Sequence, residues 1–242
     1  MPEPTLCIAM PCWNEQASVE AVVRQSLAAV AAWPGGGEVL VVDDGSTDRT
    51  PEILARLAAE DARVRVVTRP HAGLAPTLEA LKQAVRCDYA FLTASDGEWN
   101  SMTVFDMLPA VRRGADVVVG RRKQRTGYTP YRHVVSFAYN GLSRVLFGVP
   151  TWDAGSQRLI RSRLLHDVPR TSRSVYADAE FLIRCQYLGY KVEVVDVEHT
   201  ARTAGKGGGA RPRLVVAAAL DMLRLWRKKS ALGSDGVRNA NA

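Results

Sequence analysis

The stretch Val39-Leu40-Val41-Val42-Asp43-Asp44-Gly45-Ser46 runs from a continuous apolar segment directly into two carboxylates and a glycine. An uninterrupted apolar run of this kind indicates a strand that is buried on both faces, as in a parallel sheet. Thr50-Pro51 then begins a helix, with threonine as the cap and proline at the first helical position. The stretch therefore predicts a strand, a polar loop and a helix in immediate succession.

The same alternation continues on both sides of this stretch. We expect further strands at residues 6–10, 64–67, 89–93 and 117–119, and helices at residues 17–33, 50–59, 74–85 and 103–113. Strands that alternate with helices favour parallel pairing, so the expected fold class is α/β, with an open, mostly parallel sheet flanked by helices. After residue 120 we expect helices at residues 131–147 and 178–188, a strand at 192–197 and a basic helix within 211–232.

The composition is typical of a folded, soluble protein whose partners carry phosphate. Apolar residues make up 47% of the 242 residues, and the net charge of +7 favours nucleotides, anionic membranes or nucleic acid as partners. No nucleic-acid-binding motif accompanies the charge, so no nucleic-acid partner is expected. The four cysteines have no metal-binding spacing, and residues 2–4 lack the basic start and apolar core of a signal peptide. We therefore expect a cytoplasmic protein with reduced thiols.

Polar residues gather where the predicted strands end, at Pro11–Glu15, Asp43–Ser46, Ser95–Glu98 and Gly120–Arg122. In open α/β sheets, ligands bind beyond the carboxyl ends of the strands. The sequence has neither the glycine-rich dinucleotide fingerprint nor a Walker A motif. The acidic groups favour another kind of site, with hydrogen bonds to a base and a ribose and a metal that holds phosphates.

With these motifs, the chain resembles the family 2 glycosyltransferases, and within them the polyprenol- or dolichol-phosphate mannose and glucose synthases. The matching residues occur in order: Pro11, Asn14 and Glu15; residues 41–48; residues 95–100; Arg122, Arg132, Asn140, Asp153, Ser156, Asp178, Glu180, His199, Arg202, Gly205 and Lys206. The resemblance covers about residues 5–206 and implies the GT-A nucleotide-diphospho-sugar transferase fold. It implies one catalytic domain at residues 1–210, with a donor half to about residue 120 and an acceptor half after it. Residues 233–242 are polar and small, so a flexible tail is expected there.

The resemblance also implies an inverting, metal-dependent transfer of a sugar from a donor such as GDP-mannose or UDP-glucose. It assigns the nucleotide to Pro11, Asn14, Glu15, Asp43, Asp44, Ser95 and Lys206, and the catalytic roles to Arg122, Arg132, Asp178 and Arg202. Mg²⁺ or Mn²⁺ would be held by Asp96 and Glu98. Ala94 stands where the family has the first acid of its D-x-D motif, so a metal-free site, or a nucleotide-sugar-binding protein without turnover, is the alternative.

The expected acceptor is a polyprenyl phosphate, and a small hydroxylated molecule is the alternative. Asp178 is either the base that takes the acceptor's proton or an acid that favours the helix dipole, and Glu180 is expected to orient or cap. Asp153 and Ser156 would line the acceptor side, and His199 either approaches the diphosphate or is a buried, hydrogen-bonded histidine. Arg161, Arg163 and Arg170 are expected to be solvated surface residues.

The last predicted helix has two contrasting sides. On a helical projection, one side carries Val215, Ala219, Met222 and Trp226, and another carries Arg213, Arg224, Arg227 and Lys228. The pattern fits a helix that lies on an anionic membrane surface, and it equally fits a helix packed on the domain with its charges in water. A peripheral contact with the inner face of the cell membrane is therefore one expected location.

Overall fold

The structure is a computed structural model that describes residues 3–123, 130–148, 156–172, 174–198 and 212–232. Its strands are β1 (Leu6–Cys12), β2 (Gly37–Asp43), β3 (Val64–Thr68), β4 (Tyr89–Leu92), β5 (Val117–Arg122), β6 (Arg158–Arg161) and β7 (Val192–Val197). Its α-helices are α1 (Val19–Ala32), α2 (Thr50–Glu60), α3 (Leu74–Ala84), α4 (Val104–Arg112), α5 (Pro130–Phe147), α6 (Leu164–Asp167), α7 (Ala177–Tyr187) and α8 (Pro212–Arg227). The strand and helix alternation expected from the sequence is confirmed.

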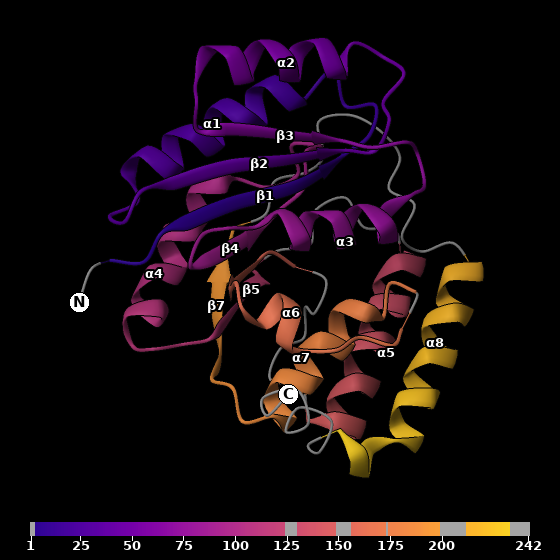
Figure 1. Ribbon diagram of the computed structural model, residues 1–242. Coiled ribbons are helices and arrows are strands. Elements are labelled where there is room, and N and C mark those ends of the chain that lie inside the picture. Colours follow the sequence, from indigo (N-terminus) through magenta and orange to yellow (C-terminus); the bar gives the residue numbers. More distant parts are fainter. Residues whose placement is uncertain (1–2, 124–129, 149–155, 173, 199–211, 233–242) are drawn as a thin grey trace.

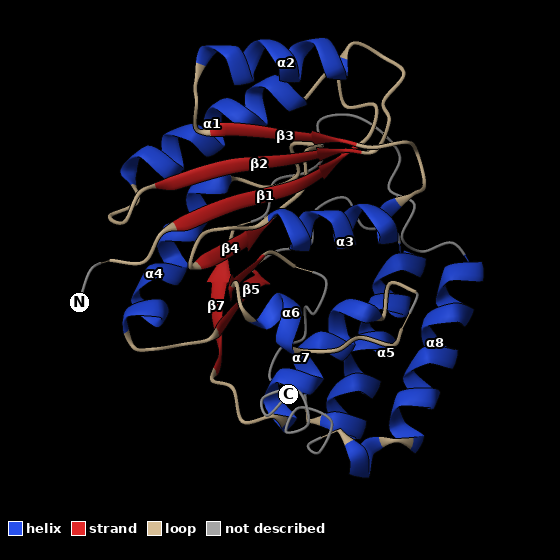
Figure 2. Ribbon diagram, in the orientation of Figure 1, coloured by secondary structure: helices blue, strands red, loops and turns tan. Residues whose placement is uncertain are grey.

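The strands form one sheet in the order β3-β2-β1-β4-β6-β5-β7 (Figure 2). All neighbouring pairs are parallel except those of β6, which runs antiparallel to both β4 and β5. The expectation of an open, mostly parallel sheet is therefore confirmed. The strand β6 was not predicted, because only Leu159 and Ile160 of its four residues are apolar and a run that short carries no period.

Helices cover both faces of the sheet, as the apolar strands require. Alternate residues of each strand point to opposite faces, and the two faces have separate cores. One core joins α1, α2 and α4 to residues such as Ile8, Val41 and Val118. On the other face, α3, α6 and α7 contact the strands, and the core there continues to α5 and α8, which lie side by side farther from the sheet (Figure 1).

One edge of the sheet collects several of the residues singled out from the sequence. The parallel strands β1, β2, β4 and β5 all have their carboxyl ends at this edge. Because β6 is antiparallel, its first residue also lies there: Arg158 is in register with Leu92 of β4 and with Val119 of β5. The fold thus brings residues from five strands to one edge.

Candidate functional site

The loops after β1 and β2 are held together by hydrogen bonds. The backbone N–H of Asn14 donates to Ser46 Oγ (2.8 Å), and Asn14 Oδ1 accepts from the backbone N–H of Thr47 (2.8 Å). Asn14 has a positive φ of 53°, which asparagine tolerates better than most residues. Glu15 is held in the same loop, because its backbone N–H donates to Thr50 Oγ1 (2.9 Å). These loops therefore form one wall at the edge of the sheet.

Asp43, at the end of β2, has one satisfied carboxylate oxygen and one that is not. Its Oδ1 accepts from the backbone N–H (3.2 Å) and the hydroxyl (2.5 Å) of Ser46. Its Oδ2 is buried and has no hydrogen-bond partner within the described residues. A buried carboxylate oxygen that lacks a donor costs free energy. The side chain is thus arranged to accept a hydrogen bond from a bound molecule.

Asp44 is engaged within the protein instead. Its carboxylate pairs with Arg69 (2.8 Å) and His71 (2.9 Å) and accepts from the backbone N–H of Gly73 (2.8 Å). Burial works against its ionisation, but hydrogen bonds from Thr77 and from the backbone of Gly73 and Ala72 outweigh that penalty and lower the pKa of Asp44. An ionised Asp44 therefore holds the segment after β3 against the end of β2.

Trp13 is a feature of this edge that the sequence pattern did not single out. Its ring is 50% exposed and stacks on His71, with the ring centroids 4.6 Å apart. Since Asp44 holds His71, the exposed stack stands beside the two aspartates. The sequence offered one signal for this residue, because Trp13 lies between Pro11 and Asn14 of the first polar motif.

The loop after β4 joins the wall formed by β1. Ser95 Oγ donates to the carbonyl of Pro11 (2.9 Å), and Ser18 Oγ donates to the carbonyl of Ser95 (2.9 Å). The chain then turns at Gly97, where φ is 75°. The backbone N–H of Glu98 donates to Asp96 Oδ1 (3.0 Å), so the two acids lie in one tight loop.

The acids of this loop are the candidate metal ligands. Both Asp96 and Glu98 are partly exposed, and the described residues contain no cluster of three or more His, Cys, Asp or Glu side chains that could hold a metal. Two carboxylates are nevertheless the usual protein contribution to a Mg²⁺ that also binds substrate phosphates and water. The hard oxygen donors that are present therefore fit Mg²⁺ or Mn²⁺.

Arg122 reaches the same edge from β5, and its guanidinium lies 4.9 Å from the centre of the Trp99 ring. Trp99 ends the loop of the two acids, so the cation lies beside the candidate metal ligands. Arg132 lies on α5, but its side chain is not among those that the structure describes. Asp153, His199, Arg202 and Lys206 lie outside the described residues.

The expected acceptor side is occupied by charged pairs. Arg158 Nη2 pairs with Asp178 Oδ1 at 2.8 Å, at the beginning of α7. Glu180 is fully buried, pairs with Arg184 (2.7 Å) and accepts from the backbone N–H groups of Thr171 and Ser172. Glu180 therefore holds residues 171–172 and the side chain of Arg184 against α7. Ser156 is also buried, just before β6.

Two of the three arginines expected at the solvated surface have other environments. Arg161 pairs with Asp116 at 2.9 Å. Arg170 lies over the Phe181 ring, 5.0 Å from its centre, and its Nε and Nη2 atoms are buried. The surface prediction is wrong for Arg170, because apolar side chains of α7 cover a residue that the sequence places in a loop. Arg163 remains largely exposed, as expected.

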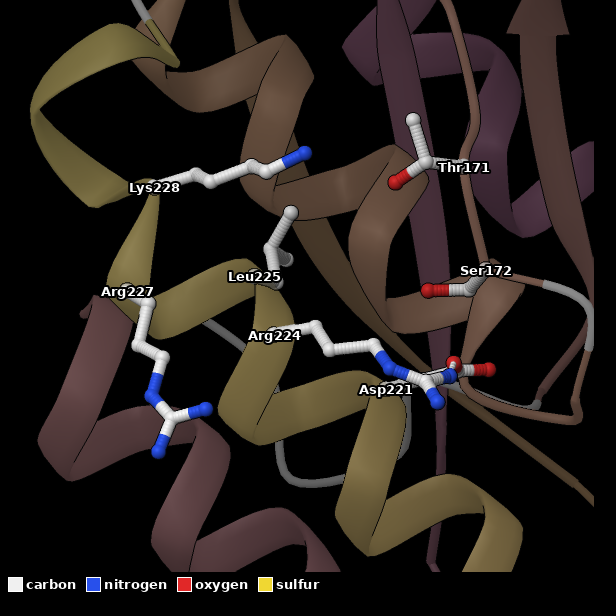
Figure 3. A pocket seen from close by; sticks show the side chains of 7 residues that line it. All are labelled: Thr171, Ser172, Asp221, Arg224, Leu225, Arg227 and Lys228. Carbon is white, nitrogen blue, oxygen red and sulfur yellow. Dashed lines mark hydrogen bonds and ion pairs between the residues drawn. The ribbon is translucent and has the colours of Figure 1, made fainter.

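A separate cavity of about 460 Å³ lies between the end of α8 and residues 171–172. Arg224, Arg227 and Lys228 contribute to its lining, with the hydroxyl residues Thr171 and Ser172 opposite (Figure 3). Arg224 is paired with Asp221 at 3.0 Å, whereas Figure 3 shows Lys228 extending toward the side of Thr171 and Arg227 pointing away. The cavity is basic, but it belongs to α8 rather than to the loops that follow β1, β2 and β4.

Comparisons with known proteins agree on one family and one fold. The family model described as "Glycosyl transferase family 2" matches residues 7–183. An uncharacterized glycosyltransferase of Mycobacterium tuberculosis is 29% identical over 201 residues, covering 82% of this chain and 87% of that protein. A dolichyl-phosphate hexose transferase of Haloferax volcanii is 28% identical over 226 residues, covering 89% of this chain and 94% of that protein.

Solved structures show the same fold at low sequence identity. Mannosyl-3-phosphoglycerate synthase from Rubrobacter xylanophilus has a TM-score of 0.74 at 15% identity, covering 95% of this chain and 79% of that one. Glucosyl-3-phosphoglycerate synthase from Mycobacterium tuberculosis, solved with Mn²⁺, UDP-glucose and phosphoglyceric acid, has a TM-score of 0.69 at 19% identity, covering 90% and 80% of the two chains. The expected GT-A fold is thereby confirmed.

Proposed function

The chain belongs to glycosyl transferase family 2, and from this we propose that it transfers a sugar from a nucleoside diphosphate sugar to a polyprenyl phosphate. It is a glycosyltransferase. One observation carries the proposal. Asp43, whose Oδ2 has no hydrogen-bond partner among the described residues, lies at the same edge of the sheet as the loop of Asp96 and Glu98. A nucleoside diphosphate presents a base, a ribose and a charged diphosphate, which matches that sequence of groups.

We assign the nucleoside to the wall formed by the loops after β1 and β2. Asp43 Oδ2 would accept a hydrogen bond from the base or the ribose, and the ring of Trp13 would stack on the base. Pro11, Asn14, Glu15 and Ser95 would shape this wall, since their hydrogen bonds fix its loops. Asp44 would act indirectly, by holding His71 under Trp13.

We assign the diphosphate to the loop after β4. Asp96 and Glu98 would hold Mg²⁺ or Mn²⁺, which supplies Lewis-acid stabilisation of the departing diphosphate when bound. Structures of glucosyl-3-phosphoglycerate synthase in this fold contain Mn²⁺ or Mg²⁺ with uridine diphosphate, which supports the assignment. Arg122 would add positive charge from β5, and Arg132, Arg202 and Lys206 remain candidates for the same task.

Glu98 is expected to replace the carboxylate that Ala94 lacks. Glu98→Gln should therefore weaken the affinity for Mn²⁺ by roughly 10- to 100-fold while leaving the fold intact, because one hard anionic ligand becomes neutral. The measurement is the Mn²⁺ concentration that gives half-maximal nucleotide binding in calorimetric titrations. Glu52→Gln, on the exposed surface of α2, is the control. An unchanged Mn²⁺ requirement in Glu98→Gln would remove Glu98 from the metal site.

The proposed reaction is a single in-line displacement that inverts the anomeric carbon. An acceptor oxygen forms the new bond to that carbon while the bond to the diphosphate oxygen breaks, and the diphosphate leaves with the electron pair. A phosphate acceptor is already ionised at neutral pH and needs no base. A hydroxyl acceptor must lose a proton, and Asp178, which is one-third exposed in its pair with Arg158, would be the group to take it.

Asp178→Asn distinguishes these two acceptor classes. With a polyprenyl phosphate we expect kcat to fall by less than about 10-fold, because the acceptor brings its own negative charge. With a hydroxyl acceptor the loss should reach roughly 10²–10⁴-fold, the usual contribution of a positioned base. The assay compares initial rates for a short-chain polyprenyl phosphate and for phosphoglyceric acid, which is a named ligand of the glucosyl-3-phosphoglycerate synthase in this fold. Full activity of the variant with both acceptors would exclude Asp178 from the mechanism.

The acceptor proposal draws support from relatives and from the surface of α5 and α8. Two relatives are named for work on lipid phosphates, the dolichyl-phosphate hexose transferase and a dodecaprenyl-phosphate galacturonate synthase of Rhizobium johnstonii, which is 29% identical over 168 residues. No helix among the described residues is long and apolar enough to cross a membrane. An enzyme that uses a lipid phosphate must reach the membrane surface.

The neighbouring helices α5 and α8 expose an unusual amount of apolar surface (Figure 1). Nine large apolar side chains on them are 41–85% exposed: Tyr131, Val134, Phe137, Leu142 and Val145 on α5, and Val216, Leu220, Leu223 and Trp226 on α8. We call this set the α5–α8 face. The apolar side predicted for α8 is partly wrong. Met222 was predicted on that side, but it is buried against the domain, and the exposed apolar residues lie at other positions around the helix.

The α5–α8 face fits an anionic membrane better than a second copy of the chain. Exposed basic residues accompany it, namely Arg144, Arg213, Arg224, Arg227, Lys228 and Lys229. Two such faces would bring like charges together, whereas a lipid surface offers both an apolar interior and anionic headgroups. The basic cavity at the end of α8 could receive a headgroup phosphate.

Liposome sedimentation tests this surface. The protein should sediment with vesicles of phosphatidylcholine and phosphatidylglycerol at low salt and be released at high salt, because each basic residue near an anionic surface adds about 1 kcal/mol. Phe137→Glu with Val145→Glu should abolish sedimentation while nucleotide binding persists. Glu substitutions at Arg56 in α2 and at Arg63 just before β3, on the other side of the molecule, are the control. Failure of the wild-type protein to sediment at low salt would favour a soluble hydroxylated acceptor.

A further inference from the structure

Arg170 is a largely buried cation that has no ion pair with any residue the structure describes. Its guanidinium stacks on Phe181, and neither its Nε nor its Nη2 has a hydrogen-bond partner among the described residues. No carboxylate of those residues lies within 4 Å of it, although the charges of Asp178 and Glu79 act on it from farther away. Burial, followed by the nearby charge of Arg158, lowers the pKa of Arg170. Because arginine keeps its proton in proteins, the guanidinium of Arg170 is a largely buried positive charge that an anion could neutralise.

Arg158 is the second cation of the same cluster. It begins β6 on the sheet face that carries Val119 and Ile160, the face that α7 covers. Its Nη2 pairs with Asp178, but its buried Nε has no hydrogen-bond partner in the described part of the chain. Of the two guanidinium groups, only that of Arg158 pairs with a carboxylate among the described residues. Three of their nitrogen atoms, Arg158 Nε and Arg170 Nε and Nη2, have no hydrogen-bond partner there.

The cluster of Arg158 and Arg170 lies near the edge of the sheet where the sugar would be transferred. Arg158 is directly opposite Leu92, the last residue of β4, and the loop of Asp96 and Glu98 begins just after that strand. The cluster opens to solvent through Asp178, whose side chain is 33% exposed. An anion bound by Arg158 and Arg170 would thus lie next to the proposed donor site, on the side of that site that faces α7.

We propose that Arg158 and Arg170 form the binding site for the phosphate group of the acceptor, with Asp178 holding Arg158 in place. This inference rests on the proposed function and deepens it. A phosphate monoester carries nearly two negative charges and three acceptor oxygens, so it can satisfy N–H donors from two guanidinium groups at once. Binding it would give Arg170 its first ion pair and would complete the hydrogen bonds of Arg158.

The proposal predicts opposite effects of Arg170→Gln on stability and on acceptor binding. In the ligand-free protein the variant removes an unpaired buried charge, so Tm should stay level or rise by about 2–4 °C. The KM for a short-chain polyprenyl phosphate should rise about 10- to 100-fold, because charge-assisted hydrogen bonds are lost. The donor KM should stay within about twofold, and Arg170→Lys should recover part of the acceptor affinity. A residue that only supports the fold would lower Tm when replaced.

Arg163→Gln is the matched control, since Arg163 lies in the same segment with a 63% exposed side chain and should change neither KM. The proposal is overturned if Arg170→Gln has a lower Tm than the wild type, or if its acceptor KM is unchanged. It is also overturned if the wild type glycosylates only uncharged acceptors; metal-dependent nucleotide binding would then persist and the glycosyltransferase function would stand. Loss of the proposed function itself would be distinguished by a wild type that binds no nucleoside diphosphate with Mn²⁺.

Discussion

Asp43→Asn is expected to weaken nucleoside diphosphate binding by about 100-fold or more. The asparagine can keep the hydrogen bonds that Asp43 Oδ1 accepts from Ser46, so the loop should retain its shape. In the orientation that keeps these bonds, the NH₂ group of the amide takes the place of Oδ2, and the negative charge of the carboxylate is lost. The wild type would accept a hydrogen bond from the base or ribose at this position, whereas the variant offers a donor. A donor that faces another donor in a buried site weakens binding severely.

Calorimetric titration with UDP and GDP in the presence of Mn²⁺ measures this effect. Asp88→Asn is the matched control, because Asp88 lies just before β4 at the opposite edge of the same sheet and bonds to Thr5. That variant should bind nucleotide like the wild type. If Asp43→Asn kept wild-type affinity for every nucleotide tested, the nucleoside would have to lie elsewhere than on the β1–β2 wall.

Asp96→Ala is expected to lower kcat/KM by about 10³-fold. The variant removes the one acid that this chain retains from the D-x-D motif, and a single remaining carboxylate at Glu98 holds Mg²⁺ or Mn²⁺ poorly. Electrostatic stabilisation of a departing diphosphate contributes several kcal/mol to such reactions, which corresponds to a loss of this size. Nucleotide binding should become weak and independent of Mn²⁺, while the base and ribose contacts remain.

Transfer rates measured over a range of Mn²⁺ concentrations test the role of Asp96. Asp106→Ala, at an exposed position in the first turn of α4, is the control and should keep the metal response. If the wild type and Asp96→Ala respond equally to Mn²⁺, Asp96 does not bind the metal.

The edge of the sheet was predictable from the sequence because its signals are local. Each motif follows an apolar run in the chain, so β1, β2, β4 and β5 could be recognised together with the loops of Asn14, Asp43 and Asp96. Parallel pairing then places these loops side by side, and the structure links them through Ser46 and Ser95. Local pattern and global topology agree here, which is why the prediction succeeded.

The acceptor side was not predictable because its contacts are made between distant segments. The strand β6 has four residues and two arginines, so its place between β4 and β5 has no periodic signal. Its insertion brings Arg158 to Asp178, twenty residues farther along the chain. The burial of Arg170 over Phe181 depends on how α7 packs, which composition and spacing do not reveal.

The central claim is that this edge binds a nucleoside diphosphate together with a divalent metal. The most direct test is the thermal unfolding of the wild-type protein with UDP, GDP and their sugars, with Mn²⁺ and with EDTA. A ligand that binds the native state raises Tm by mass action, by several degrees when its concentration is about 100 times Kd. We predict such a rise for one nucleotide class with Mn²⁺ and little or none with EDTA. Equal Tm values for all nucleotides, with and without Mn²⁺, would contradict the claim.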